Sequence, residues 1–396
     1  MDLSLTDEQR MLADSVRSVF SGAEDDPTSG ADAPDGALTF RRDLWRQAAE
    51  LGMTGLVIDE RYDGAGAGVG EAYAAAGVLG DLAVPEPVTD LAHVPAWLLQ
   101  DLGSEDQKST WLPGIATGER LVALAHAEAG TGWSDPRGAT VVDGRLSGTK
   151  RAVAAPGDVD AFLVTAVQDG ALGVYLVTAD DGVTVSVHRD AQWAPVGSVE
   201  FRDAPAERLD GDGSEQAPEQ APEQALRRAV ALARVVEGGR AAGLMGAAMT
   251  RTVEYLKVRK QFGVTLNNFQ VLTHRAAQLY SDVELARSTA LWAAAMAETA
   301  EAADNGEIGL EELEAAALDS YVFLARQARV VAEESIQLHG GIGVTYETAV
   351  SHYAAALTGF RQLYGGVLEA RGEGVASKGL VDTPSALLNN QLFTYG

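Results

Sequence analysis

Three long helical stretches in the last part of the chain limit the folds that it can adopt. They cover residues 227–259, 267–303 and 310–340, and each is rich in Ala and apolar over a broad face. A helix that is apolar around most of its surface must be covered on several sides, by other helices or by another subunit. The sequence therefore predicts a C-terminal helical bundle over residues 226–396.

The first 120 residues also show a helical period. Apolar residues between Leu5 and Phe20 recur at helical spacing behind Thr6, and "TDEQ" at 6–9 predicts a capping box. Two further helical runs, at 44–58 and 70–84, are separated by a Gly-rich turn. Residues 1–120 are therefore predicted to form an N-terminal helical domain.

The middle of the chain has a different pattern. Short, β-branched, nearly alternating runs separated by Gly, Asp and Pro predict a small antiparallel β domain, barrel or sandwich, over 121–209. The stretch 210–225 is acidic, contains "APEQ" twice and has no apolar face, which indicates a solvated linker or loop. The expected fold class is mainly α with a middle β domain.

The charge and the cysteine content exclude several function classes. A formal net charge of −27 argues against binding to nucleic acid or to anionic membranes. The absence of Cys excludes disulfides, thiolate metal sites and cysteine nucleophiles, and the His spacing predicts no metal site. We expect neither a signal peptide nor a membrane span, and therefore a cytoplasmic protein.

Two glycine-containing stretches of the bundle indicate a ligand. In "RKQFG", Arg259 follows a helix and offsets its dipole, while Gly263 makes a turn. In "QLHGGIG", a C-cap accounts for Gly340, but not for Gly341 and Gly343 as well. Each stretch alone is weak evidence.

Together these stretches resemble the acyl-CoA dehydrogenase superfamily. The resemblance extends over nearly the whole chain, through "LSLTDEQRMLADSV", "LWRQAAELGMTGLVIDERYDGAG", "ALAHAEAGTGWSD", "RKQFG" followed by "FQ", and "IQLHGGIGVTYE". It implies a flavoprotein with an N-terminal helical domain, a middle β domain and a C-terminal four-helix bundle. FAD would lie between the last two domains and reach into a neighbouring subunit, so that the chain would form a homodimer, a homotetramer or a heterotetramer with a related subunit.

The resemblance also implies the cofactor-binding residues. Arginine suits a diphosphate because its guanidinium pairs with two oxygens at once. Arg259 and Phe262 would hold the diphosphate and adenosine end of FAD, with Gln270 in the same strip. Further contacts would come from the β-domain loop and from the neighbouring chain, through Glu128, Gly132, Ser134, Gln337, Gly340 and Gly341.

The reaction implied by the family is α,β-dehydrogenation of an acyl-CoA thioester, in which a carboxylate removes the α-proton. Here the sequence departs from the family. The usual Glu position is Gly365, in "LYGG", and a second known position is Ala233. Glu237, one turn further on, is a candidate base, although it can equally pair with Arg234 or Arg240. The catalytic base is therefore unknown from the sequence.

Other residues near the expected flavin ring also depart from the family pattern, namely Ala127, Ala152, Ala154 and Ala356. His126, His339 and His352 are interpreted as hydrogen-bonded structural residues. The profile resembles the partner-type subunits of heteromeric acyl-CoA dehydrogenases, which handle ring-bearing or dicarboxylic acyl-CoAs.

Three interpretations stay open at this point. The chain is a dehydrogenase with a relocated base, a catalytically inactive partner subunit that holds FAD, or a flavoprotein of the same fold with other oxidative or tailoring chemistry. The electron acceptor is not identified by the sequence, and an electron-transfer flavoprotein is one candidate.

Overall fold

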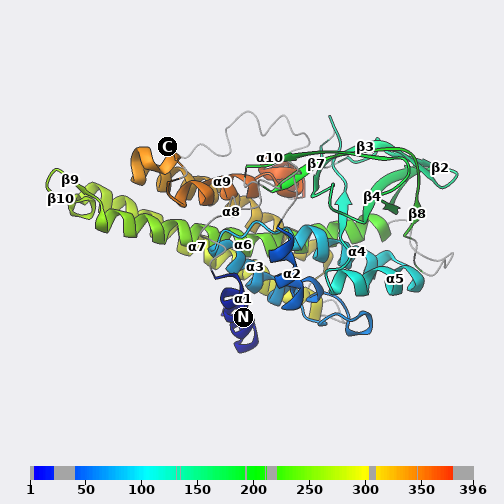
Figure 1. Ribbon diagram of the computed structural model, residues 1–396, viewed down its shortest axis with the longest axis horizontal. Helices are drawn as coiled ribbons and strands as arrows, with labels where there is room; N and C mark the ends of the chain where they lie inside the picture. The colour runs from blue at the N-terminus through cyan, green and yellow to red at the C-terminus, as the bar shows by residue number, and fades with distance from the viewer. Residues whose placement is uncertain are drawn as a thin grey trace.

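The computed structural model describes residues 4–21, 41–130, 132–133, 135–191, 194–209, 211, 221–302, 309–345 and 347–377. Helices, then a sheet, then helices follow one another along the chain. Figure 1 shows the sheet at one end of the molecule, with the longest helices extending away from it. The predicted fold class is confirmed.

The N-terminal part is helical. Its helices are α1 (Asp7–Phe20), α2 (Arg42–Glu50), α3 (Val69–Asp81), α4 (Val94–Leu102) and α5 (Glu105–Ala116). Shorter turns are η2 (Met53–Gly55), η3 (Glu60–Tyr62) and the π-helical η4 (Thr89–His93). The predicted capping box is present, because Thr6 Oγ1 accepts from the Gln9 backbone N–H at 3.1 Å and the Gln9 side chain accepts from the Thr6 N–H at 3.0 Å.

The middle strands form one sheet. They are β1 (Val122–Ala125), β2 (Thr140–Val142), β3 (Arg145–Ala154), β4 (Ala161–Gln168), β5 (Ala171–Thr178), β6 (Val183–Arg189), β7 (Pro195–Pro205) and β8 (Glu207–Arg208). The order is β6-β7-β3-β2-β4-β5-β8, with β1 beside β4. The purely antiparallel sheet that we expected is wrong in one respect, since β1 and β2 run parallel to β4. Chain-neighbour hairpins can be read from turn residues, whereas these pairings join strands that are distant in sequence.

The C-terminal part is a helical bundle. It comprises α6 (Ala221–Val258), α7 (Gln270–Ala302), α8 (Leu310–His339), α9 (Val350–Phe360) and α10 (Gly366–Ser377). A hairpin of β9 (Lys260–Gln261) and β10 (Val264–Thr265), followed by η5 (Leu266–Asn268), joins α6 to α7; η6 (Gly340–Val344) and η7 (Leu363–Gly365) complete the region. In the predicted linker 210–225, Asp210 and 212–220 lie outside the described residues, and the remainder from Ala221 is already helical.

The N-terminal helices pack on the bundle mainly through α3 and α6. Glycines allow their backbones to touch, since a Cβ added to Gly243 would lie 2.0 Å from the Gly77 carbonyl oxygen. A continuous core extends from this contact into the sheet. The close crossing holds α6 against both parts of the molecule, and α6 carries residues of both candidate sites described below.

Candidate active site

The end of α6 presents the predicted diphosphate and adenosine residues to the surface. Arg259 follows the helix and is exposed, and no ion pair to another described residue occupies its guanidinium. Phe262 is 90% exposed with a φ of +53°, and its ring meets that of Phe269 edge to face at 6.0 Å. A large exposed ring beside an available arginine suits a nucleotide or a second subunit.

The end of α8 lies beside the end of α6. The His339 ring stacks on Tyr255 of α6 with 4.4 Å between centroids, so that Gln337, Gly340 and the "RKQFG" segment share one end of the bundle. Gln337 is exposed. Gly340 ends the helix with a φ of +68°, a conformation that favours glycine.

The other two glycines of this stretch, Gly341 and Gly343, differ in whether the surrounding structure requires a glycine. A Cβ on Gly343 would lie 2.8 Å from the Ile336 carbonyl oxygen, so close packing within the chain requires glycine there. Gly341 has no positive φ, and a Cβ added to it would meet no atom within 4 Å. Nothing in the described part of the chain therefore requires glycine at 341.

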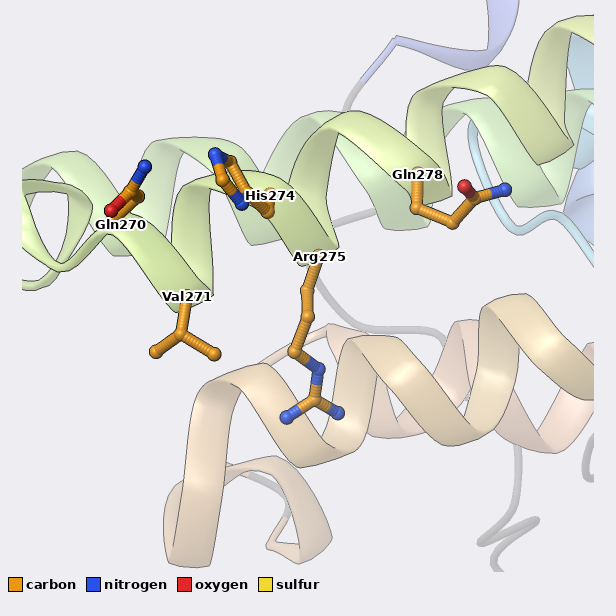
Figure 2. Close-up of a pocket in the computed structure, with 5 residues that line it drawn as sticks. All are labelled: Gln270, Val271, His274, Arg275 and Gln278. Carbon is orange, nitrogen blue, oxygen red and sulfur yellow. The ribbon is translucent and has the colours of Figure 1, made fainter.

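A shallow groove of about 450 Å³ follows the start of α7. It is lined by Gln270, Val271, His274, Arg275 and Gln278 (Figure 2). Arg275 reaches toward α8 and pairs with Glu334 at 2.9 Å. Gln270, which the sequence placed at the cofactor, is thus on an open groove at the same end of the bundle as Arg259.

The three residues of the β-domain loop that were predicted to contact the cofactor, Glu128, Gly132 and Ser134, differ in where the structure places them. Glu128 is buried, and its carboxylate accepts from Lys150 Nζ at 2.5 Å and from the backbone N–H groups of Gly138 at 2.6 Å and Ala139 at 3.0 Å. Burial alone would raise the pKa of Glu128, but the bonds and charge of Lys150 outweigh it and lower that pKa. The carboxylate is thus directed into the protein, where it shapes the loop. Ser134 lies outside the described residues.

Gly132 lies where the loop meets α10. Its φ is +68°, and a Cβ there would fall 2.1 Å from Glu369 Oε1. The Glu369 carboxylate accepts from the Trp133 backbone N–H at 3.1 Å. These contacts place the Gly132–Trp133 segment against the turn that contains Gly365.

Neither usual base position carries a carboxylate. Ala233 is fully buried in α6, and Gly365 has a φ of +91° between two further residues of positive φ, Tyr364 at +48° and Gly366 at +71°. A Cβ at 365 would lie 2.9 Å from Glu369 Oε2 and 3.1 Å from the Trp133 Cβ. The backbone itself therefore favours glycine at this position.

Glu237 is buried behind this turn. It accepts from the Thr89 hydroxyl at 2.6 Å and pairs with Arg240 at 3.5 Å, while Arg234 instead donates to the Tyr364 carbonyl oxygen at 2.9 Å. Of the two pairings left open by the sequence, the structure shows the one with Arg240. Glu237 stays a candidate base, but its carboxylate is already engaged.

A further, half-buried carboxylate was missed by sequence reasoning. Asp90, in the π-helical turn η4, accepts from the Tyr364 hydroxyl at 2.8 Å, and burial raises its pKa to about 7, with Glu237 adding to the effect. The two residues are 274 positions apart in the chain. A π-helical turn is frequent at functional sites but has no simple sequence signature.

A crevice of about 720 Å³ separates the sheet from the bundle. Its sheet side carries His126, Trp133, Asp135, Pro136, Arg137 and Leu172; its helical side carries Glu223, Leu226, Arg227, Val230, Ala231, Arg234, Glu311, Glu314, Ala315 and Leu318. The α6 residues form one stripe at helical spacing that leads inward to Arg234. Trp133, at the inner end, meets Tyr364 edge to face with 5.7 Å between ring centroids.

Two other residues that depart from the family pattern, Ala152 and Ala356, also lie within the described part of the chain. Ala152 has a φ of +52°, and Ala356 is buried in α9.

None of the helices in the described ranges combines the length and hydropathy of a membrane-spanning segment. Within the same ranges, His, Asp and Glu side chains form no group of three that would suit a metal ion.

Comparison with known proteins gives consistent matches at both ends of the chain. Residues 6–119 match the family described as acyl-CoA dehydrogenase, N-terminal domain, and residues 224–378 match acyl-CoA dehydrogenase, C-terminal domain. The chain is 29% identical to acyl-CoA dehydrogenase FadE28 of Mycobacterium tuberculosis over 371 residues, which is 92% of this chain and 96% of the relative. It is 30% identical to benzylmalonyl-CoA dehydrogenase of Aromatoleum aromaticum over 306 residues, covering 72% and 78% of the two chains.

Solved structures are similar over almost the full length. A variant of the Tcur3481-Tcur3483 steroid ACAD matches with a TM-score of 0.81 and 25% identity, covering 95% of this chain and 99% of that one. The ChsE4-ChsE5 complex from Mycobacterium tuberculosis matches with a TM-score of 0.78 and 26% identity, covering 97% and 100%.

Proposed function

Because the chain belongs to the acyl-CoA dehydrogenase family, a family of FAD-dependent oxidoreductases, we propose that it is such a dehydrogenase or a subunit of one, and that its substrate and cofactor residues lie in two separate places, the crevice and the exposed bundle end. The crevice would take the acyl-CoA, and the bundle end would hold the cofactor together with a second subunit. The observation that carries this proposal is the crevice of about 720 Å³ that ends at Trp133 and Arg234, beside the turn containing Gly365.

The residues present at the bundle end fit FAD. Arg259 offers an available guanidinium for a diphosphate, Phe262 an exposed ring, and Gln270 an amide on an open groove. Gly341 leaves space that nothing in the described chain fills. In this proposal Gln337, Gly340 and Gly341 serve the cofactor of the neighbouring subunit, and the FAD supplies the acceptor for the hydride of the β-carbon.

The crevice has the charges that a CoA thioester needs. Arg137 and Arg227 lie among its lining residues toward the surface, where they would meet phosphates, although Arg137 pairs with Asp135 at 3.3 Å and Arg227 pairs with Glu314. Arg234 is buried at the inner end and holds the Tyr364 carbonyl oxygen. Because the relatives include a benzylmalonyl-CoA dehydrogenase and a steroid ACAD, ring-bearing acyl groups are the first to test.

The visible spectrum of the purified chain, followed by anaerobic addition of acyl-CoAs, tests this function. We expect a bound flavin whose absorbance near 450 nm is lost with at least one thioester. A matched pair separates the cofactor site from general stability. Gly341→Ala lies in open space and should lower flavin content, whereas Gly77→Ala, which also has no positive φ and whose Cβ would lie an ordinary 3.7 Å from the Gly239 carbonyl oxygen, should not. A colourless protein that binds no CoA thioester contradicts the proposal.

A second candidate is supported by the engaged carboxylates around Gly365. Glu237 and Asp90 are already hydrogen-bonded, which suits a subunit that holds FAD while a related partner supplies the base. The similar ChsE4-ChsE5 structure is described as a complex. If this is correct, the chain alone keeps its flavin, but an acyl-CoA removes the flavin absorbance only after the partner is added. An electron-transfer flavoprotein is then the first electron acceptor to try in either case.

A further inference from the structure

Strand β6 forms one edge of the sheet, since β7 is its only partner among the described strands. Residues 183–187 of this strand, "VTVSV", carry no charge, and Val185 is 39% exposed. The pairing of β6 with β7 shows no register shift over its seven residues. β6 is therefore a regular, uncharged and partly exposed edge strand.

The other edges of the described sheet are protected. At the opposite end of the strand order, β8 has only two residues, both charged, and β5 beside it is buried over 173–177. β1, which lies beside β4, has four residues and is mostly buried. Proteins commonly guard an exposed edge with short length, charge, proline or a bulge, because its free N–H and C=O groups can bind a strand of another chain. Residues 183–187 have none of these features.

Alternate residues of β6 direct their backbone groups at β7. In an antiparallel pair, every second residue bonds the partner strand, and the residues between them direct N–H and C=O away from it. The Gly182 carbonyl oxygen accepts from the Arg202 N–H at 2.8 Å. At the other end of the strand, the Asp190 N–H donates to the Ala194 carbonyl oxygen at 3.0 Å. The even-numbered residues of β6 are therefore those that bond β7.

The odd-numbered residues Val183, Val185 and Val187 direct their backbone groups at the open edge. The Val183 N–H donates to the Asp180 carbonyl oxygen at 3.2 Å in the preceding turn, whereas its carbonyl oxygen faces the edge. A further antiparallel strand must therefore bond β6 through these three valines.

The sequence of β6 is complementary to itself in the antiparallel direction. About a two-fold axis at Val185, this residue meets its own copy and exchanges both backbone bonds with it. The Val187 N–H then donates to the Val183 carbonyl oxygen of the other copy. On the opposite face Thr184 meets Ser186, and hydroxyl side chains of this kind pair favourably across strands. This register uses the edge-facing groups of both copies.

The charges at the two ends of β6 agree with this pairing. Asp181 precedes the strand and Arg189 ends it. An antiparallel second copy brings the acidic end of one strand beside the basic end of the other, and opposite charges across strands are stabilising. The next residue, Asp190, is held in its own loop, where its carboxylate accepts from the Ala194 N–H at 2.9 Å. A parallel second copy would instead bring like charges together.

We propose that β6 is an interface between two copies of this chain, in which the two β6 strands pair antiparallel about a two-fold axis at Val185 and join the two sheets into one. The proposal goes beyond the proposed function, because it involves neither cofactor nor substrate. It also uses a different surface from the exposed bundle end, since the sheet and the β9–β10 hairpin lie at opposite ends of the molecule (Figure 1).

Single cysteines test the register, because the chain has no cysteine of its own. At Val185 the two Cα atoms would lie about 5.5 Å apart, within the disulfide range of about 4.4–6.8 Å. In the matched control Thr184→Cys, the two cysteines would be diagonal neighbours about 7–8 Å apart, which is too far. Under mild oxidation of the full chain, we expect Val185→Cys to form a covalent dimer about 10-fold faster than Thr184→Cys or more, on non-reducing gels.

Val185→Lys tests the assembly without a cross-link. Two lysines that meet on the axis repel, and lysine is a residue that proteins use to block sheet edges. We expect a molar mass about half that of the wild type by light scattering, with an unchanged circular dichroism spectrum. Val142→Lys is the control, since Val142 is 67% exposed on β2, which β7 and β3 separate from β6. It should keep the wild-type mass.

Three outcomes overturn the proposal. The first is equal cross-linking of Val185→Cys and Thr184→Cys, which random collision would give. The second is a folded Val185→Cys protein that forms no covalent dimer, as when another segment of the same chain covers the edge. The third is a Val185→Lys protein with the wild-type mass. These measurements need neither flavin nor thioester, so they stay decisive if the proposed function fails.

Discussion

Replacing Lys150 with methionine tests how the β-domain loop that contains Glu128 is held. Lys150 is fully buried and donates to Glu128 at 2.5 Å, to the His126 carbonyl oxygen at 3.1 Å and to Thr165 Oγ1 at 3.2 Å. Methionine has a similar volume but leaves the Glu128 carboxylate buried without its counter-ion. Removing one partner of a buried pair costs about 3–5 kcal/mol, because the remaining charge is uncompensated.

The expected change is measurable by thermal unfolding. With an unfolding entropy of about 2.1 cal/mol/K per residue over the 396 residues, that loss corresponds to a fall in Tm of about 4–6 °C. Arg202→Met removes an exposed pair, Arg202 with Glu200 at 2.8 Å, and serves as the control. It should cost no more than about 1 kcal/mol, or about 1 °C.

Two further measurements test whether the uncompensated charge of Glu128 causes the loss of stability. Lys150→Met combined with Glu128→Gln should lose less than the two single changes added together, since no unpaired charge remains. The pKa of Glu128 is lowered in the folded protein, so its contribution is present above the unfolded value near 4.3 and is lost as pH falls through the folded pKa. The difference in free energy of unfolding between wild type and Lys150→Met should therefore become smaller on acidification from pH 6. A Lys150→Met protein as stable as Arg202→Met at pH 7 refutes the argument.

Three other changes have defined outcomes. Gly243→Ala should lower Tm although alanine favours helices by about 1 kcal/mol, because its Cβ would lie 2.0 Å from the Gly77 carbonyl oxygen; an unchanged Tm contradicts the close crossing. Gly365→Glu should lower Tm and add no flavin bleaching, since φ is +91° there; faster bleaching would show that the turn accepts a carboxylate. The pKa of Asp90 is raised to about 7, so its carboxyl favours the folded state below its unfolded pKa and loses this contribution as pH rises through about 7. Asp90→Asn should therefore gain stability relative to wild type between pH 5 and pH 8, by at most about 1.4 kcal/mol per pH unit in urea unfolding, and a constant difference would exclude the shift.

Local sequence was sufficient for the elements of the fold. The helical period predicted α6, α7 and α8, and "TDEQ" predicted the Thr6 cap, because hydrogen bonds within a few residues determine these features. The same holds for the turn at Gly263, whose φ is +85°. The roles of Arg259, Phe262 and Gln270 came from the family resemblance and stay predictions, as do those of Gly340 and Gly341 in η6.

Tertiary structure decided the chemistry around the crevice. Glu128 and Lys150 are 22 positions apart, and Asp90 and Tyr364 are 274 apart, so no local pattern could pair them or show which carboxylate is engaged. The tautomer of His126 likewise depends on the Trp133 carbonyl oxygen, which folding brings to 2.9 Å. Sequence period specifies which backbone hydrogen bonds form, whereas the charge and the hydrogen-bonding state of a buried group depend on neighbours that only the packed chain supplies.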